Sequence, residues 1–550
     1  MNTILERLAQ LGYDCFASVT LQQGAREAAK AAREQRKLEA AERLQNRLGQ
    51  RISFNLITPG VRAVHLHIGP TNSGKTHHAL EQLKTADRGL YLAPLRLLAW
   101  EAADRLNEQG CPTDLVTGEE SVEVEGARVI AATTEMFPEG VYDVVVIDEA
   151  QMVADPDRGW AWLRAMTQAK AGELHVCAAP QAEPFLRQLF ETLGDELTVT
   201  WYERLVPLRP HHEAIPLKRL PPRSAVVAFS RQAVLQLKAE IEQVHRKPCA
   251  VIYGALPPDV RREQARRVRS GEAPFVVATD AIGMGINFPV DHVFLYDVVK
   301  YDGRSERPLR TEEVRQIIGR AGRFGLSEAG WYGALSRENH HALLAIAAEE
   351  PAPITHAYLQ PSIDQLQMLT GRLAKRLQLW QLLAEPVVPE FIRIAPLEQM
   401  IELARLLPPQ LEEDLKTAYM LITAPVTRES QAYWKAVVEA LVANRRAPAP
   451  SGITGQIGSD AELQTAEGAL RQHELALWLM RRGVDCRVNE RFLRRTREYI
   501  ADAMNTALAR GLTMGGCKLC GRRLPPGYRF RICQACYEAS RDIGAPRRDV

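Results

Sequence analysis

The sequence lacks the features of membrane and secreted proteins. No window of its 550 residues reaches the roughly 18 uninterrupted apolar residues that a membrane-spanning helix needs. The first 19 residues carry Glu6 and Asp14, and they lack the basic start, long apolar core and cleavage site of a secretory signal. The same two acids disfavour a mitochondrial transit peptide. We therefore expect an intracellular protein.

Cysteine is sparse as well, because nine in a chain of this length do not suggest a disulfide scaffold. Five of them are scattered, and we interpret them as small buried hydrophobic residues. These five are Cys15, Cys111, Cys177, Cys249 and Cys486. The other four cluster near the C-terminus, with a spacing that is described below.

A strong excess of one charge is also absent, since the formal net charge is only +2. Composition alone therefore does not indicate nucleic-acid binding. Residues 487–550, however, hold fourteen Lys and Arg against six Asp and Glu, a local net charge of +8 that leaves −6 for the rest. A basic tail on a slightly acidic body fits a nucleic-acid contact surface. The alternative is a solvated helix face followed by a soluble tail.

What the sequence does contain is a regular alternation of strands and helices in two blocks. Short β-branched runs separated by helical stretches are typical of doubly wound parallel sheets. The expected strands are 64–68, 90–94, 128–133, 143–148 and 174–179 in the first block, and 225–230, 249–254, 274–279 and 292–297 in the second. Between the blocks, residues 204–222 hold five prolines, which suits a linker.

The most informative motif is a complete phosphate-binding loop. Its spacing is G-x-x-x-x-G-K-T, and it follows an expected strand and opens a helix, which is the context that such a loop needs. The loop consists of Gly69, Pro70, Thr71, Asn72, Ser73, Gly74, Lys75 and Thr76. Its N–H groups would cradle the phosphates of ATP, Lys75 would face the β- and γ-phosphates, and Thr76 would bind Mg²⁺. The alternative is a chance match, which the next motif disfavours.

A DEAQ tetrad at 148–151 follows the expected strand 143–148. Asp148 at the carboxyl edge of a parallel strand would hold Mg²⁺ through water, and Glu149 would be the general base for the attacking water. Acidic pairs also cap helices. The phosphate loop in the same sheet favours the catalytic interpretation.

A third motif, QIIGRAGR, occupies residues 316–323. Arg320 and Arg323 are three apart and would share a face if the segment is helical. Two arginines aimed at a γ-phosphate stabilise phosphoryl transfer, and Gln316 adds specificity to the motif. A basic surface helix is the alternative.

With these three motifs the chain resembles superfamily 2 helicases, and more closely the suppressor-of-Var-three RNA helicases of the mitochondrial degradosome, which have bacterial relatives. The matching strings are GPTNSGKT (69–76), LAPLRLLAWE (92–101), TGEE (117–120), TTEM (133–136), DEAQM (148–152), IYGALPP (252–258), ATDAIGMGIN (278–287) and QIIGRAGRF (316–324). The resemblance covers about residues 60–345 firmly and continues weakly beyond them. We interpret the chain as a bacterial relative and expect a cytoplasmic location.

The resemblance implies further roles for residues of these strings. Backbone contacts to nucleic acid are implied for Arg96, Thr117, Gly118, Thr133, Glu135 and Thr279. Asp280 and Gly283 would couple the contact at Thr279 to the nucleotide, and Gln151 would link the DEAQ strand to the second domain. One departure matters, because the third family motif usually carries a Gly-Glu pair where this chain reads CAAP at 177–180. In the family this motif couples hydrolysis to unwinding, so the change puts that coupling in question for this chain.

Asp302-Gly303 lies between two short extended runs, and this dipeptide favours a hairpin turn. Related helicases place a strand-separating hairpin here. A surface loop is the alternative.

The C-terminal cysteines form two CxxC pairs, Cys517 with Cys520 and Cys533 with Cys536, with twelve residues between the pairs. Two such pairs in an intracellular chain predict a structural Zn²⁺ site with four thiolate ligands. A redox role would need a thioredoxin-like βαβ setting, which this part of the sequence does not show. The degradosome helicases do not end this way, so the module would bind either a single strand or a partner protein.

We therefore expect an α/β chain with two tandem RecA-like parallel-sheet domains, an α-helical C-terminal region and a small four-cysteine zinc module. The predicted division is 1–58 (N-terminal helical segment), 59–206 (first RecA-like domain), 207–345 (second RecA-like domain), 346–445 (helical domain), 446–460 (linker), 461–512 (helical segment) and 513–550 (zinc module and basic tail).

The function that we expect is that of an ATP-dependent RNA helicase that moves 3′-to-5′ along a single strand. Its ligands would be ATP, Mg²⁺, Zn²⁺ and RNA, and an exoribonuclease such as polynucleotide phosphorylase would be its partner. Two alternatives stay open. One is a DNA helicase or translocase, acting on DNA or an RNA–DNA hybrid. The other is a nucleotide-switched RNA clamp that recruits a nuclease and unwinds little.

Overall fold

The computed structural model describes most of the chain between residues 60 and 512. The described ranges are 60–283, 289–301, 305–322, 327–453, 455–484 and 488–512, with the single positions 35, 36, 39, 43, 46, 325 and 536. These residues belong to two compact units. One contains His356–Thr423, and the other contains the described parts of Ile57–Thr355 and Ala424–Val550. Among the described residues, no helix has the length and apolar character needed to cross a membrane.

The first sheet of the larger unit has eight strands in the order β4-β3-β5-β2-β6-β7-β1-β8, all parallel except β4. They are β1 (Ala63–Ile68), β2 (Gly89–Ala93), β3 (Thr113–Val116), β4 (Ser121–Val122), β5 (Val129–Thr133), β6 (Val141–Ile147), β7 (Lys170–Ala178) and β8 (Glu196–Trp201). Every residue of β2 is buried, because helices cover both faces of the sheet.

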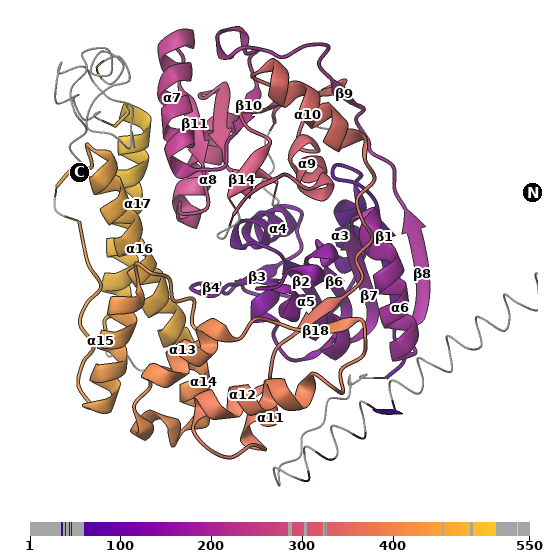
Figure 1. Ribbon diagram of the computed structural model, residues 1–550, viewed down its shortest axis with the longest axis vertical. Helices are drawn as coiled ribbons and strands as arrows, with labels where there is room; N and C mark the ends of the chain where they lie inside the picture. Colours follow the sequence, from indigo (N-terminus) through magenta and orange to yellow (C-terminus); the bar gives the residue numbers. More distant parts are fainter. Residues whose placement is uncertain are drawn as a thin grey trace, which may run out of the picture. The chain divides into compact units, whose positions relative to one another are not determined.

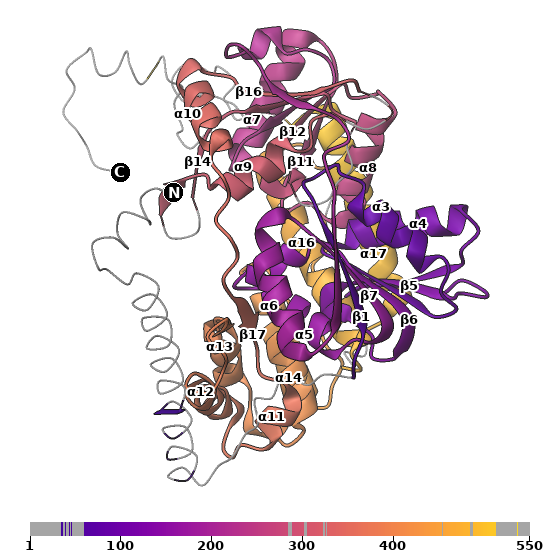
Figure 2. The ribbon, with the colours of Figure 1, turned by 90° about the vertical axis from the view of Figure 1, so that its right-hand side faces the viewer.

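In the described part of the chain, helices cover both faces of this first sheet. They are α3 (Lys75–Leu83), α4 (Arg96–Glu108), α5 (Gly159–Gln168) and α6 (Glu183–Leu193). Figure 2 shows α5 and α6 on one side of the sheet and α3 and α4 on the other. Leu80 of α3 and Leu97 of α4 pack into one core cluster with Tyr91 and Val146 of the sheet. This arrangement places the loops that follow the strands at one carboxyl edge.

The second sheet has six parallel strands in the order β11-β12-β10-β13-β16-β9. They are β9 (Leu208–Pro210), β10 (Ser224–Val227), β11 (Cys249–Ile252), β12 (Phe275–Ala278), β13 (His292–Leu295) and β16 (Gly330–Ala334). Its helices are α7 (Arg231–His245), α8 (Pro258–Arg269), α9 (Thr311–Ile318) and α10 (Arg337–Ala348). The predicted fold class of two parallel-sheet, RecA-like domains is confirmed. Within the proline-rich stretch 204–222, which we expected to link the two blocks, β9 extends the second sheet at its edge.

Further helices of the larger unit are α15 (Gln431–Val442), α16 (Asp460–Arg481) and α17 (Glu490–Arg510). Figure 1 shows α16 and α17 side by side in the yellow part of the chain. Apolar side chains of both helices, such as Leu470 and Ile500, join the core cluster of the second sheet, which contains Val234 and Val251. α16 and α17 therefore share a core with the second sheet.

The smaller unit is mainly helical. It pairs β17 (Ala357–Leu359) in parallel with β18 (Ile392–Ile394) and holds α11 (Ile363–Gln367), α12 (Leu373–Ala384), α13 (Glu398–Leu406) and α14 (Leu415–Thr423). Trp380 is completely buried within it, and its indole N–H donates to Gln365 at 3.0 Å.

The predicted hairpin before the third motif is confirmed as an antiparallel pair. β14 (Val299–Tyr301) pairs with β15 (Glu306–Pro308), while the turn residues Asp302 and Gly303 lie outside the described part of the chain. Lys300 and Arg307 from the two strands both reach Glu313 of α9, at 2.7 and 2.8 Å. Burial opposes ionisation of Glu313, but hydrogen bonds from Arg307, the Arg310 N–H and Lys300 lower its pKa to about 2. The hairpin is thus tied by charge to the helix that leads into QIIGRAGR.

Candidate nucleotide and nucleic-acid site

The phosphate loop joins β1 to α3 at the carboxyl edge of the first sheet. The Gly69 N–H donates to the Ala178 carbonyl at 3.1 Å, which ties the loop to the neighbouring strand β7. Lys75 opens α3, is 7% exposed, and donates to the Pro70 carbonyl at 3.2 Å. Asn72 adopts a left-handed conformation with φ of 61°, which asparagine tolerates better than most residues. The Lys75 ammonium is therefore curled inside the loop, where a phosphate would meet it.

The two expected magnesium ligands lie next to each other. The Thr76 hydroxyl donates to Asp148 Oδ1 at 3.1 Å, and the Tyr91 hydroxyl donates to Asp148 Oδ2 at 3.0 Å. Burial raises the pKa of Asp148 to about 6, with Glu149 adding to the rise and Lys75 opposing it. A hydroxyl and a carboxylate are the hard oxygen donors that Mg²⁺ takes. The residues present therefore fit the ion.

Glu149 follows β6 in a strained conformation. Its φ of 50° is left-handed, which costs a non-glycine residue about 1 kcal/mol or more and is common at functional sites. The side-chain amide of Gln151 donates to the Glu149 carboxylate, and its oxygen accepts from the Ala179 N–H at 3.0 Å. Gln151 thus joins Glu149 to the CAAP segment, and both hydrogen bonds stay within the first sheet domain.

QIIGRAGR reaches this site from the second domain. α9 ends at Ile318, so Arg320 lies beyond the helix, and the shared helix face expected for the two arginines is not formed. Arg320 donates to the Gly283 carbonyl, and Gln316 lies in α9. Burial lowers the pKa of Arg320, while Glu149 and Asp148 pull it upward. The guanidinium therefore lies within the field of the two acids, and Arg323 lies outside the described residues.

The phosphate loop touches the third motif directly. Asn72 Nδ2 donates to the Gly322 carbonyl at 2.7 Å. A Cβ added at Gly319 would come within 3.0 Å of Thr71 Cβ, so glycine allows this approach. Residues separated by about 250 positions thus form one site between the two sheets.

Arg204 is a residue of this site that the sequence interpretation missed. It donates to the Thr71 carbonyl in the phosphate loop at 2.9 Å, to the Gly319 carbonyl in the third motif at 2.9 Å, and to the Ala321 carbonyl. Burial, together with the neighbouring Arg320, lowers the pKa of Arg204 to about 10. No motif marks it, since it lies in a stretch whose prolines suggested a linker.

Arg96 lies at the start of α4, and acidic groups from two distant segments meet its side chain. It pairs with Glu119 of the TGEE string and, at 3.5 Å, with Glu474 of α16. Burial raises the pKa of Glu119 to about 7, and Glu474 adds to the rise while Arg96 opposes it. α16 thus reaches a predicted nucleic-acid contact.

Gly118 shows the same relation to α16. A Cβ at Gly118 would lie 3.0 Å from Trp478 Cδ1, so any larger residue would press on this indole. The Arg482 guanidinium stacks over the Trp478 ring, 3.7 Å from its centroid. α16 also reaches the second sheet domain, where Glu467 accepts from the Tyr253 hydroxyl at 2.6 Å. One helix therefore lies along motifs of both sheets.

The remaining predicted contacts lie after strands of the two sheets. Thr133 ends β5 and is buried, and Glu135 just beyond it pairs with Arg158 at 2.6 Å. Thr279 follows β12, and its hydroxyl accepts from the Ala281 N–H at 3.3 Å. Asp280 pairs with Lys300 of the hairpin at 3.0 Å.

Comparison with family models decides the type of domain. Residues 53–202 match the DEXQ-box helicase domain of Suv3, and residues 212–325 match the helicase conserved C-terminal domain. The chain carries a Suv3-like DEXQ helicase domain. A helicase C-terminal domain follows it, so the phosphate loop and QIIGRAGR fall in the two halves of a helicase core.

Two curated relatives of this Suv3-like core carry helicase names. The ATP-dependent RNA helicase SUV3, mitochondrial, of Oryza sativa subsp. japonica is 40% identical over 56% of this chain and 54% of its own length. The protein of the same name from Saccharomyces cerevisiae is 42% identical over 48% of this chain and 37% of its own. The chain spans about half the length of the curated relatives that it matches. Their names contradict the expected bacterial cytoplasmic location, which is therefore wrong.

Among solved structures, the Escherichia coli DEAH/RHA helicase HrpB is similar at 16% identity and a TM-score of 0.44, over 80% of this chain and 58% of that one.

Proposed function

We propose that the protein is an ATP-dependent RNA helicase. The observation that carries the proposal is the direct contact between the phosphate loop and the third motif, made by the Asn72–Gly322 hydrogen bond and by Arg204. A nucleotide bound at this interface would contact groups from both sheet domains, so its binding would depend on how the two sheets are placed. The relatives are named ATP-dependent RNA helicases, which supports ATP as the nucleotide that is hydrolysed and RNA as the substrate.

In this proposal the phosphate loop binds the nucleotide phosphates, with Lys75 facing the β- and γ-phosphates. Thr76 and Asp148 would hold Mg²⁺, which neutralises the charge that develops on the phosphates. Glu149 accepts a proton from the attacking water. Arg320 and Arg323 stabilise the transferring phosphoryl group, a contribution of about 10³–10⁵ in rate for an arginine finger.

Gly283 and Asp280 then connect the nucleotide to the strand contact at Thr279. Arg320 donates to the Gly283 carbonyl, and Asp280 pairs with Lys300 of the hairpin. A shift of Arg320 on nucleotide release would therefore reach both the Thr279 segment and β14. We propose this path as the coupling between hydrolysis and strand movement, in 3′-to-5′ direction.

The single strand would lie between the carboxyl edges of the sheets and α16. Arg96, Thr117, Gly118, Thr133 and Glu135 would contact its backbone from the first domain. Such contacts carry no sequence information, which suits an enzyme that moves along any strand.

Two finer proposals rest on the sequence. Cys517, Cys520 and Cys533 lie outside the described residues, and Cys536 is described only as an isolated position. We propose that the four hold one structural Zn²⁺, and an unchanged zinc content in Cys517→Ser would contradict this ligand set. We also propose an exoribonuclease as partner, since a released 3′ strand is the substrate of such an enzyme.

Strand displacement tests the function. The substrates are RNA, DNA and hybrid duplexes with a 3′ or a 5′ tail, and Glu149→Gln is the control. We expect ATP-dependent displacement of RNA with a 3′ tail and none by Glu149→Gln. Displacement of DNA only would refute the RNA assignment. Hydrolysis without displacement of any duplex would favour the RNA clamp, for which the altered CAAP segment is the specific observation.

A further inference from the structure

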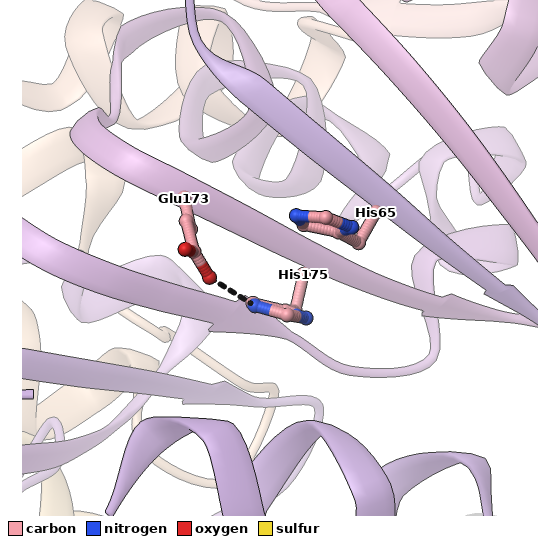
Figure 3. Close-up of side chains that lie close together, drawn as sticks. All are labelled: His65, Glu173 and His175. Carbon is pink, nitrogen blue, oxygen red and sulfur yellow. Dashed lines mark hydrogen bonds and ion pairs between the residues drawn. The ribbon is translucent and has the colours of Figure 1, made fainter. Parts of the chain in front are cut away.

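Three metal-ligand side chains gather on one face of the first sheet, apart from the nucleotide site. His65 lies in β1, and Glu173 and His175 lie two residues apart in β7. The strands pair in parallel with His65 opposite His175, and residues two apart share a face, so all three point the same way. Figure 3 shows the two rings stacked and the Glu173 carboxylate turned toward His175.

We propose that His65, Glu173 and His175 bind one divalent transition-metal ion, with Zn²⁺ as the ion that suits them best. Two imidazoles and one carboxylate are a known zinc donor set. The three ligand atoms lie within 4.8 Å of one another, and Glu173 Oε2 lies 3.2 Å from His175 Nε2. Tetrahedral ligands with bonds of about 2.1 Å lie about 3.4 Å apart, so the three side chains are close enough to share an ion. The two imidazole rings are stacked with their centroids 4.7 Å apart, so one ring must turn about its side-chain bonds before both nitrogens point at the ion.

The site is open on one side and closed on the other. The His175 side chain is 4% exposed, whereas that of Glu173 is 50% exposed. In β8, on the outer side of β1, Thr198 pairs with His65 and is exposed at the edge of the sheet. An ion can therefore enter from solvent, and a water molecule can take the fourth position.

A second layer of groups is already arranged behind His175. Its Nδ1 lies 2.9 Å from His67 Nε2, and His67 Nδ1 lies 2.7 Å from the Tyr202 hydroxyl. With Nε2 on the ion, the Nδ1–H donates to His67, which in turn donates to Tyr202. Such a donor chain behind a ligating histidine fixes its tautomer.

This relay ends beside the phosphate loop. The Tyr202 N–H donates to the Ile68 carbonyl at 2.8 Å, and a Cβ at Gly69 would come within 2.9 Å of Tyr202 Cβ. An ion at His65 would thus brace the strand that carries the loop.

Equilibrium dialysis of the full chain against buffered Zn²⁺ tests the proposal. The samples are wild type, His65→Gln, Glu173→Gln and the control His341→Gln, which changes an exposed histidine of α10. We expect wild type and His341→Gln to hold one more zinc per chain than the other two. Zinc on the C-terminal cysteines is common to all four proteins and cancels. Equal zinc content in all four would overturn the site.

A melting series without and with Zn²⁺ makes the test independent of folding defects. Both substituted side chains reach solvent, so we expect equal melting temperatures without the ion. Zinc should then raise the melting temperature of wild type and His341→Gln more than that of His65→Gln and Glu173→Gln. An equal rise in all four proteins would also overturn the proposal.

Discussion

Arg204→Ala is the substitution that most sharply tests the interface between the two sheets. The guanidinium joins the Thr71 carbonyl of the first domain to the Gly319 and Ala321 carbonyls of the second. A hydrogen bond to a charged group contributes about 1.5–3 kcal/mol. Because burial already disfavours this cation, as its lowered pKa shows, the lower value applies.

Two such bonds to the second domain amount to about 3 kcal/mol. This is roughly a hundredfold in the population of molecules whose phosphate loop contacts the third motif. We therefore expect Arg204→Ala to lower kcat/KM for ATP by about 10- to 100-fold, with Arg204→Lys between it and wild type. The assay is steady-state ATP hydrolysis at saturating RNA. Arg219→Ala, an exposed arginine of the same stretch, is the control. A kcat/KM for Arg204→Ala equal to that of the control would refute the reasoning.

Three further substitutions test separate contacts. Because the pKa of Glu313 is lowered to about 2, its ionised carboxylate stabilises the folded protein above its ordinary pKa, and this stabilisation is lost as pH falls toward about 2. Glu313→Gln should therefore lower the unfolding free energy, measured in urea, by about 1–3 kcal/mol at pH 7 and by little near pH 2. A cost independent of pH would contradict this. Asp195→Asn weakens the fully buried pair with Arg62, at 2.6 Å, and should cost about 3–5 kcal/mol of unfolding free energy; an unchanged urea midpoint would argue against it. Gly118→Ala should push the Trp478 ring away and weaken RNA binding, measured by a fluorescence titration. An unchanged affinity would show that the contact between Gly118 and Trp478 plays no part in RNA binding.

The parts of the fold that the sequence predicts are those encoded locally. A phosphate loop is a strand, a glycine-rich turn and a helix in immediate succession, and the DEAQ tetrad follows its own strand, so each carries its context with it. All nine strands expected in the two blocks are present, because buried parallel strands are short β-branched runs that need no knowledge of their neighbours.

The parts that escaped prediction depend on contacts between distant residues. Arg96 meets Glu474 across 378 positions, and no local pattern announces that α16 lies along both sheets. Arg204 is one arginine among prolines, and only the folded chain brings it to the phosphate loop. Arg320 does not lie on a helix face as expected, and the reason is local. Gly319 ends α9 just before it and allows close contact with Thr71.

The central claim is that the interface between the two sheets couples ATP hydrolysis to a bound strand. The most direct test is the rate of ATP hydrolysis with and without single-stranded RNA, for wild type and Arg320→Ala. Coupling predicts that RNA raises the wild-type rate severalfold and that Arg320→Ala stays slow with or without RNA. A wild-type rate that is the same in the presence and absence of RNA would contradict the claim.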